Sequence, residues 1–287
     1  MTQSLPRVFE PDWGNLNWSD WIDFDGGNVK RFGDSAGFYR IRIAGHPVLA
    51  LIGQAGRDLG QGLHDLRRAV FASSMPFSDP YPAAPGLWAW RDAQGHAYEC
   101  SVAPSHAHRR RRLAMECWLL WQYRLVTGGS TLCNFGHFPP GYIRSKTRST
   151  KFRGGRSDDE ADAAAERIRG SSPLRLSGRP SAANWMGIDW SGRHSLAAVP
   201  AGAYPALYRI FDAKSEKLLY VGETQSFGQQ MKRHSERNWS GRAPVVSWHR
   251  VADGVAKLHL REWSNDLIGA YLDATGDAPE LQFSGGG

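Results

Sequence analysis

The sequence predicts an α+β fold built from two similar domains, and two observations carry this prediction. The pair GFYRI (37–41) and ALIGQ (50–54) recurs as ALYRI (206–210) and LYVGE (219–223), with both members displaced by the same 169 residues. In each copy, strand-like segments also alternate with segments of helical periodicity. Such an order favours a small, mostly antiparallel sheet flanked by helices in each domain.

The repeat continues on both sides of this pair. Upstream, DWGNLNWS (12–19) is similar to NWMGIDWS (184–191), and each stretch holds two Trp five residues apart. Three further pairs follow downstream in the same order: APGLWAWRDAQGHA (84–97) with APVVSWHRVADGVA (243–256), AMECWLLWQYRLVTG (114–128) with REWSNDLIGAYLDATG (261–276), and LCNFG (132–136) with ELQFSG (280–285). So many similarities in one order indicate a duplicated domain.

Each copy begins with a β-hairpin that leads into a helix. The segments FYRIRI (38–43) and VLALIG (48–53) are rich in β-branched and aromatic residues, which favour strands. In the second copy, DAKSEK (212–217) has the polar composition of a turn. We expect the helices at LGQGLHDLRRAVFA (59–72) and SFGQQMKRHSERNW (226–239).

A third strand and a second helix complete each copy. We expect the third strand at LWAWR (87–91) and at VVSWHR (245–250). The second helix is expected at RRLAMECWLLWQYRL (111–125) and LREWSNDLIGAYL (260–272), where apolar residues recur at helical spacing. The predicted order in both copies is therefore β-β-α-β-α.

A polar segment rich in Gly, Ser, Pro and charged residues separates the copies. It covers residues 146–182 and predicts domains over residues 1–145 and 183–287. We expect a solvated linker here, with a short helix over 158–169. Its basic first part is an alternative candidate for phosphate contacts: Lys146, Arg148, Lys151, Arg153 and Arg156.

The composition describes a folded, basic chain. Of its 287 residues, 41% are hydrophobic, and twelve Trp indicate packed cores. A net charge of +7 favours a polyanionic partner such as nucleic acid. No apolar run reaches the length of a membrane span, and the first residues lack the features of a signal peptide. The three Cys form no CxxC pair, so we expect reduced thiols in a cytoplasmic protein and no metal cluster.

The paired Gly-x-Tyr and Tyr-Val-Gly segments, each followed by a helix, a strand and a helix, resemble the GIY-YIG nuclease family. The first copy has Gly37-Phe38-Tyr39 and Leu51-Ile52-Gly53 at these motifs, and the second has Leu207-Tyr208 and Tyr220-Val221-Gly222. The resemblance implies two tandem GIY-YIG-like domains. It also implies a site that hydrolyses DNA phosphodiesters with Mg²⁺ or Mn²⁺, using two Tyr, an Arg, a Glu and an Asn.

The first copy matches this residue set in part. The resemblance assigns Tyr39 to the attacking water, Glu116 to the metal ion and Asn134 to orienting its neighbours. Leu51 stands where the second tyrosine belongs.

The arginine that would cover the phosphate is missing from its expected place near residues 61–62, which are Gln and Gly. A guanidinium is needed there because charge builds up on the phosphate in the transition state. Arg57 is the candidate substitute and Arg67 lies nearby, with two solvated arginines as the alternative.

The second copy departs from the family in a different way. Three of its residues match the family pattern: Tyr208, Tyr220 and His234. The Arg, Glu and Asn positions hold other residues: Gln230, Ser264 and Gln282. Glu262 is two residues from Ser264 and is expected on another helix face. We therefore expect the second copy to be a structural or binding domain that holds no metal.

A run of basic residues at the start of the Glu116 helix is the remaining candidate for contacts with nucleic acid. It consists of Arg109, Arg110, Arg111 and Arg112, and we group Lys146 and Arg148 with it. Cations at a helix start oppose the helix dipole, so a bound anion would relieve a local penalty. The repeated Trp pairs 13/18 and 185/190 are expected to fill cores instead of stacking on bases.

Three functional hypotheses remain open. The chain acts as a metal-dependent endonuclease-like hydrolase on DNA, with a modified site in the first domain. Alternatively, it is a nucleic-acid-binding protein that kept this fold and lost the chemistry. As a third hypothesis, the fold serves an enzyme that acts on a small-molecule substrate. Loss of one transition-state contact costs about 10²–10³ in rate, which weighs against an ordinary nuclease.

Overall fold

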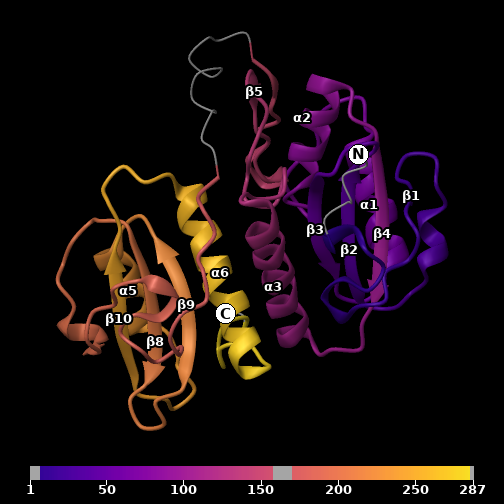
Figure 1. Cartoon of the computed structure of the whole chain (residues 1–287). Helices are drawn as coiled ribbons and strands as arrows, with labels where there is room; N and C mark the ends of the chain where they lie inside the picture. The colour runs from indigo at the N-terminus through magenta and orange to yellow at the C-terminus, as the bar shows by residue number, and fades with distance from the viewer. Residues whose placement is uncertain (1–6, 158–169, 285–287) are drawn as a thin grey trace. The chain divides into compact units, whose positions relative to one another are not determined.

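The computed structural model describes residues 7–157 and 170–284. The chain divides into two compact units, one of Met1–Ala107 with Ser130–Arg169 and one of His108–Gly129 with Gly170–Gly287. Each unit contains a four-stranded antiparallel sheet and helices (Figure 1), which confirms the predicted α+β class.

The sheet of the first unit has the strand order β1-β4-β2-β3. Its strands are β1 (Ile22–Asp23), β2 (Gly37–Ile43), β3 (Leu49–Ala55) and β4 (Tyr98–Pro104), and its helices are α1 (Leu59–Val70) and α2 (Ala84–Gln94). A separate two-stranded ribbon pairs β5 (Tyr142–Ile143) with β6 (Gly155–Arg156). The predicted hairpin and first helix of this copy are confirmed.

The second unit repeats this sheet order as β7-β10-β8-β9. Its strands are β7 (His194–Ser195), β8 (Ala206–Asp212), β9 (Leu218–Thr224) and β10 (Pro244–Arg250), and its helices are α5 (Phe227–Glu236), α6 (Lys257–Thr275) and α3 (Arg109–Thr127). Figure 1 shows α3 and α6 side by side. Short 3-10 helices occur in both units, at Arg7–Phe9, Trp13–Asn15, Val29–Phe32, Arg148–Thr150, Trp185–Gly187 and Leu196–Ala198.

The two sheets agree in register as well as in order. Tyr39 pairs with Gly53 on β3, and Tyr208 pairs with Gly222 on β9. A Cβ added to Gly53 would lie 2.4 Å from the Tyr39 hydroxyl oxygen, and the same distance separates a Cβ on Gly222 from Tyr208. Both positions therefore require glycine, because each tyrosine ring lies across the opposite strand.

The Trp-rich flanks pack in the same way in both units. The Trp18 indole N–H donates to the carbonyl of Trp13 at 2.8 Å, and that of Trp190 donates to Trp185 at 3.0 Å. All four indoles are buried. The expectation that these Trp fill cores is confirmed.

A buried arginine lies against each flank, and no motif in the sequence indicates it. The guanidinium carbon of Arg40 lies 4.4 Å from the Trp18 ring centroid, and that of Arg209 lies 4.1 Å from the Trp190 ring centroid. Arg40 donates to the backbone carbonyls of Val8, Phe9 and Glu10. Burial lowers the pKa of both arginines to about 9. The guanidiniums hold the flanks against the sheets through hydrogen bonds and cation–π contacts.

The predicted third strand of the first copy is wrong. Residues 87–91 lie inside α2, and the strand that pairs with β2 is β4. Pro85 in the first turn and Gly95 in the left-handed conformation after the last turn bound the helix. The segment 84–97 is thus an insertion that is similar to residues 243–256 in sequence but not in structure.

Helices α3 and α6 enclose a cluster of buried charges. Arg124 on α3 forms ion pairs with Glu262 at 3.1 Å and Asp266 at 2.9 Å on α6, and all three side chains are fully buried. Glu262 also accepts from the Ser171 amide, and Asp266 accepts from the Leu174 amide. Glu262 therefore points away from the position of Ser264, as expected, and supports packing.

The segment between the copies is structured at both ends. Residues 142–156 form the β5–β6 ribbon, and residues 171–174 bind the buried carboxylates. The short helix expected over 158–169 lies outside the described residues. In the described part of the chain, no helix combines the length and apolar character needed to cross a membrane.

Candidate functional site

Asn134 is bound edge-on to the backbone of strand β3. Its side-chain amide donates to the Ile52 carbonyl at 2.7 Å, and its oxygen accepts from the Ile52 amide at 2.9 Å and from the Thr131 hydroxyl at 2.6 Å. This pairing imitates a neighbouring strand and satisfies both backbone groups of Ile52.

Gln282 makes the same contact in the second unit. Its oxygen accepts from the Val221 amide at 2.7 Å, and its nitrogen donates to the Val221 carbonyl at 2.9 Å. The amide is thus needed in both copies, whatever their chemistry. The role of Asn134 shown by these contacts is to complete the edge of β3.

Tyr39 lies on β2 and is half-buried, with its ring across Gly53. The position of the second tyrosine, Leu51, is only 3% exposed and belongs to the core of this unit. Leu51 therefore contributes packing and no polar group to the site.

Arg57 lies in the exposed turn between β3 and α1 and has no hydrogen-bond or ion-pair partner among residues 7–157 and 170–284. The Gln61 side chain donates to Asp65 at 2.9 Å. Arg57 is thus available to bind an anion, and its function as a catalytic substitute stays a prediction.

Glu116 lies on α3 and is half-buried. Its carboxylate has no hydrogen-bond or ion-pair partner in the described part of the chain, and burial raises its pKa to about 7. Such a group is a candidate for binding a cation or a proton. Because α3 belongs to the second compact unit, the expected convergence of Glu116 with Tyr39 and Asn134 stays a prediction.

The described residues contain no cluster of three or more His, Cys, Asp or Glu placed to hold a metal ion. A divalent cation at Glu116 would therefore depend on water and on the phosphate oxygens of a substrate. Mg²⁺ commonly binds in this way, because it keeps several waters and takes only one or two carboxylates.

The second unit has a buried Tyr–His pair. The Tyr208 hydroxyl and His234 Nε2 lie 2.9 Å apart, and the Gln230 side-chain nitrogen lies 3.3 Å from the same Nε2. Burial, followed by the positive charge of Arg237, lowers the pKa of His234 to about 4. The imidazole is thus neutral near pH 7.

Tyr220 and Glu223 lie on strand β9 next to this pair. The Tyr220 ring stacks on Tyr208 with the ring centroids 6.1 Å apart, and the guanidinium carbon of Arg237 lies 5.3 Å from the Tyr220 ring centroid. Burial raises the pKa of the half-buried Glu223, while Lys257 and Arg261 oppose this shift. Glu223 is a further candidate for this site, and its position directly after the Tyr-Val-Gly motif is the signal in the sequence that indicates it.

The four adjacent arginines at the start of α3 do not act as one group. Arg109 donates to the Phe283 carbonyl, and Arg110 donates to the Glu280 carbonyl and pairs with Asp277. Arg112 is buried. Arg111 is exposed, so it is the member best placed to contact an external anion. The Asp277 carboxylate therefore supplies part of the negative charge that offsets the unfavourable interaction between these cations and the helix dipole.

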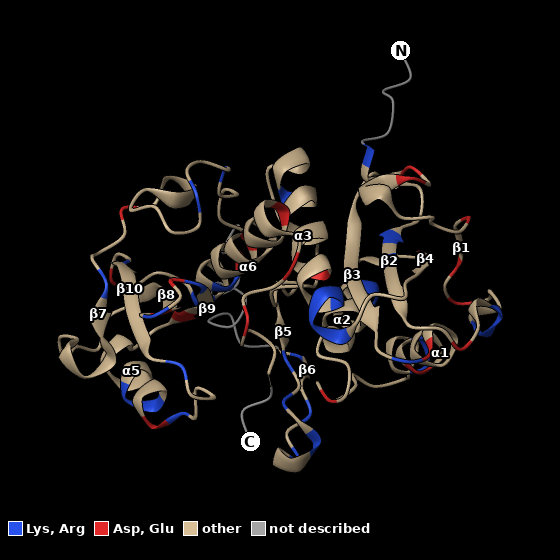
Figure 2. Cartoon of the chain, turned by 90° about the horizontal axis from the view of Figure 1, so that it is seen from below, with Lys and Arg blue, Asp and Glu red and all other residues tan. Residues whose placement is uncertain are grey.

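The β5–β6 ribbon carries five exposed cations within eleven residues, and Figure 2 shows blue segments along it. Its exposed basic residues are Lys146, Arg148, Lys151, Arg153 and Arg156. Phe152 is 40% exposed, with the Lys146 ammonium 5.2 Å from its ring centroid. Cations that flank an exposed aromatic ring are the features that bind phosphates and stack on bases.

Comparisons of the chain with protein-family models, with curated proteins and with solved structures found no match.

Proposed function

We propose that the chain is a nucleic-acid-binding protein with two tandem GIY-YIG-like domains, in which the β5–β6 ribbon contacts the phosphate backbone. The observation that carries this proposal is the ribbon itself, with five exposed cations and an exposed Phe152. DNA is the expected partner because the family resemblance and the net charge of +7 both favour it.

Binding without hydrolysis fits the residues better than an ordinary nuclease does. In the first copy, Leu51 is a core residue and Asn134 completes the edge of β3. In the second copy, Ser264 and Gln230 replace the metal ligand and the arginine. The features common to both copies, such as the Tyr–Gly crossing, support the fold and do not require catalysis.

The test is binding to labelled double-stranded DNA over a range of salt concentrations. We expect the logarithm of the affinity to fall linearly with the logarithm of salt, with a slope of about −0.9 per phosphate contact. Replacing Lys146, Lys151 and Arg156 with Ala should weaken binding and reduce the slope by roughly one unit for each cation removed.

A matched control removes the same charge from the other unit, through Lys214, Lys232 and Arg233 to Ala, all of which are exposed. This control should bind DNA with a slope close to that of the wild type. If both triple variants lose the same DNA affinity, the change in net charge explains the effect, and the ribbon proposal is contradicted.

A specific observation favours metal-dependent hydrolysis of phosphodiesters as the second candidate. The half-buried Glu116 carboxylate lacks a partner among the described residues and has a raised pKa. A divalent cation would stabilise its ionised form. In this case the protein should nick supercoiled plasmid with Mn²⁺, Glu116→Gln should abolish nicking, and the exposed Glu236→Gln should retain it. A protein that binds DNA and never nicks it would support the first candidate alone.

A further inference from the structure

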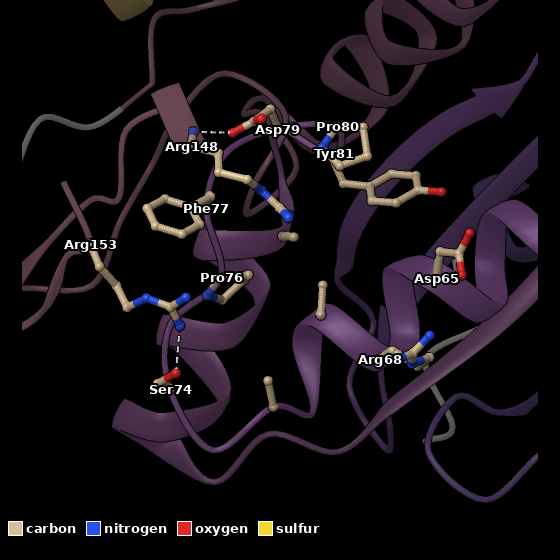
Figure 3. A pocket seen from close by; sticks show the side chains of 13 residues that line it. Asp65, Arg68, Ser74, Pro76, Phe77, Asp79, Pro80, Tyr81, Arg148 and Arg153 are labelled. Carbon is tan, nitrogen blue, oxygen red and sulfur yellow. Dashed lines mark hydrogen bonds between the residues drawn. The ribbon is translucent and has the colours of Figure 1, made fainter. Parts of the chain in front are cut away.

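A cavity of about 410 Å³ opens in the first unit beneath the β5–β6 ribbon. It lies between the end of α1, the loop before α2 and the ribbon (Figure 3). Its lining combines three Arg and two Asp with aromatic, proline and alanine side chains: Asp65, Arg68, Ala69, Ala72, Ser74, Pro76, Phe77, Asp79, Pro80, Tyr81, Ala84, Arg148 and Arg153. The volume is in the range of pockets that bind small molecules.

Two guanidiniums are gathered on one side of this cavity by a single ring. The guanidinium carbons of Arg148 and Arg153 lie 5.8 Å and 4.7 Å from the Phe77 ring centroid. Arg153 is held further by the Ser74 hydroxyl at 2.6 Å and the Met75 carbonyl at 3.2 Å. Phe77 and Ser74 thus fix positive charge beside an open volume, as a phosphate site requires.

Arg148 is anchored through its backbone and leaves its guanidinium available. Its backbone N–H donates to the Asp79 carboxylate at 2.5 Å. Its guanidinium has no hydrogen-bond or ion-pair partner in the described ranges, and it points into the cavity in Figure 3. A dianionic phosphate would pair with this group and with Arg153.

The other side of the cavity is suited to the body of a nucleotide. Tyr81 is half-buried there, and Asp65 and Arg68 reach the same side from α1 (Figure 3). Ala69 and Ala72 add small apolar side chains to the lining. A tyrosine ring offers a face on which a flat base can stack, while the Asp65 carboxylate accepts hydrogen bonds from sugar hydroxyls or from base amino groups.

We propose that this cavity binds a nucleoside monophosphate unit, with its phosphate on Arg148 and Arg153 and its base against Tyr81. Two aspartates beside three arginines leave too little positive charge for a di- or triphosphate, so one phosphate is favoured. A terminal phosphate monoester carries more charge than an internal diester. The unit is therefore either a free nucleotide or the phosphorylated end of a strand. The strand-end form rests on the proposed function, because the ribbon supplies both arginines.

The experiment compares the binding of short single-stranded oligonucleotides with a 5′-phosphate, a 3′-phosphate or no terminal phosphate, and of free adenosine monophosphate against adenosine. We expect a terminal phosphate to tighten binding by about tenfold or more, since each charge-assisted hydrogen bond contributes substantially. Arg153→Ala and Ala72→Trp, which fills the cavity without removing charge, should abolish this preference.

Matched controls separate the cavity from its surroundings. Ser73→Trp places the same ring at the exposed neighbouring residue, which does not line the cavity, and should keep the preference. Circular dichroism and a thermal melt establish that Ala72→Trp is folded. Arg68→Ala, on α1 and on the same side of the cavity as Tyr81, should weaken binding of the phosphorylated and unphosphorylated ligands alike and keep the preference.

The outcomes distinguish this inference from the proposed function. Oligonucleotides that bind through the ribbon equally with and without a terminal phosphate would overturn the cavity proposal and leave the proposed function intact. If no nucleic acid binds, the proposed function fails, and adenosine monophosphate then tests the cavity alone. If adenosine monophosphate binds to the wild type and not to Ala72→Trp, the free-nucleotide form is upheld. If it does not bind to the wild type either, the inference is overturned entirely.

Discussion

The two halves of the repeat agree in what supports their sheets and differ in what lies beside the paired tyrosines. Arg40 and Arg209 are buried against equivalent Trp pairs, and an amide side chain completes β3 in one copy and β9 in the other. These contacts satisfy backbone groups or fill cores. Their repetition indicates that the fold itself requires them.

The polar residues beside Tyr208 have apolar counterparts beside Tyr39. Leu51 corresponds to Tyr220, and Leu66 on α1 corresponds to His234 on α5 when the starts of the two helices are aligned. Both leucines are buried in the core of the first unit. One copy thus has an aromatic and histidine cluster where the other has a hydrophobic interior. The fold accommodates either set of side chains, so the residues at these positions can differ without loss of the fold.

The buried charges between α3 and α6 are the strongest asymmetry of the repeat. The residues that correspond to Glu262, Asp266 and Arg124 in the other helix are Ala114, Trp118 and Leu272. The acids therefore come from one helix and the base from the other. Removal of either kind leaves charge uncompensated in a dry environment.

The largest effect on stability is expected from Arg124→Met, because it leaves two buried carboxylates without their cation. The free energy of unfolding of the second unit should fall by about 3–5 kcal/mol. Chemical denaturation monitored by far-UV circular dichroism measures this change. Arg110→Met is the matched control on the same helix, and loss of its partly exposed pair with Asp277 should cost less than about 1 kcal/mol. Equal costs for the two variants would contradict the assigned role of the cluster.

The His234 environment predicts a pH dependence of the stability of the second unit. Its pKa falls from 6.5 in the unfolded chain to about 4 in the folded one, so the unfolded state takes up the proton first as pH decreases. Stability is therefore present above pH 6.5 and is lost between pH 6.5 and 4, by roughly 3 kcal/mol. Thermal melts at a series of pH values measure this loss.

The double variant Tyr208→Phe with His234→Leu gives the second copy the apolar solution of the first. It should reduce the pH dependence of stability between pH 6.5 and 4. The Tyr208→Phe change is included because it avoids leaving a buried hydroxyl without a partner. An unchanged pH profile in this variant would assign the dependence to other groups.

The amide contacts on β3 and β9 should have similar and smaller effects. Asn134→Leu leaves the amide and carbonyl of Ile52 without a partner, and Gln282→Leu does the same to Val221. Because β3 and β9 are edge strands, water can replace part of the lost bonding, and each variant should lose about 1–3 kcal/mol in total. Hydrogen exchange of the Ile52 and Val221 amides should accelerate by about tenfold or more in the corresponding variant only. Loss of DNA binding in Asn134→Leu with unchanged exchange at Ile52 would instead assign Asn134 to the functional site.

The elements that the sequence predicted correctly are those defined by local patterns. The hairpin of β2 and β3 follows from alternating β-branched and aromatic residues, and the long helices α3 and α6 follow from apolar periodicity. The sequence of the α2 segment predicts a strand because its Trp residues also favour strands and because it is similar in sequence to β10. Burial of Trp88 on a helix is a property of the tertiary structure.

The candidate sites were predictable only where a motif names single residues. Arg124 and Asp266 are 142 residues apart, and nothing in either local sequence indicates that they pair. Similarly, the composition of residues 146–156 predicts a solvated linker. The contacts of Arg153 with Ser74 and Met75 are not predicted because they join segments distant in sequence. Long-range pairs of this kind depend on how the elements pack, which composition and periodicity do not encode.

The smallest predicted effect concerns Glu116, which has Ser264 as its counterpart. Burial raises the pKa of this carboxyl to about 7, so the folded state holds its proton more tightly than the unfolded state does. Glu116 thus lowers stability progressively as pH rises from about 4.5 to 7. Glu116→Gln should be as stable as the wild type at pH 4 and more stable at pH 8. The gain should be about 1 kcal/mol, because water screens the half-buried group.

If Glu116 binds a cation, Mn²⁺ at pH 8 should raise the melting temperature of the wild type and leave that of Glu116→Gln unchanged. Equal shifts in both proteins would place the ion elsewhere and would remove the main support for metal-dependent chemistry in the first copy.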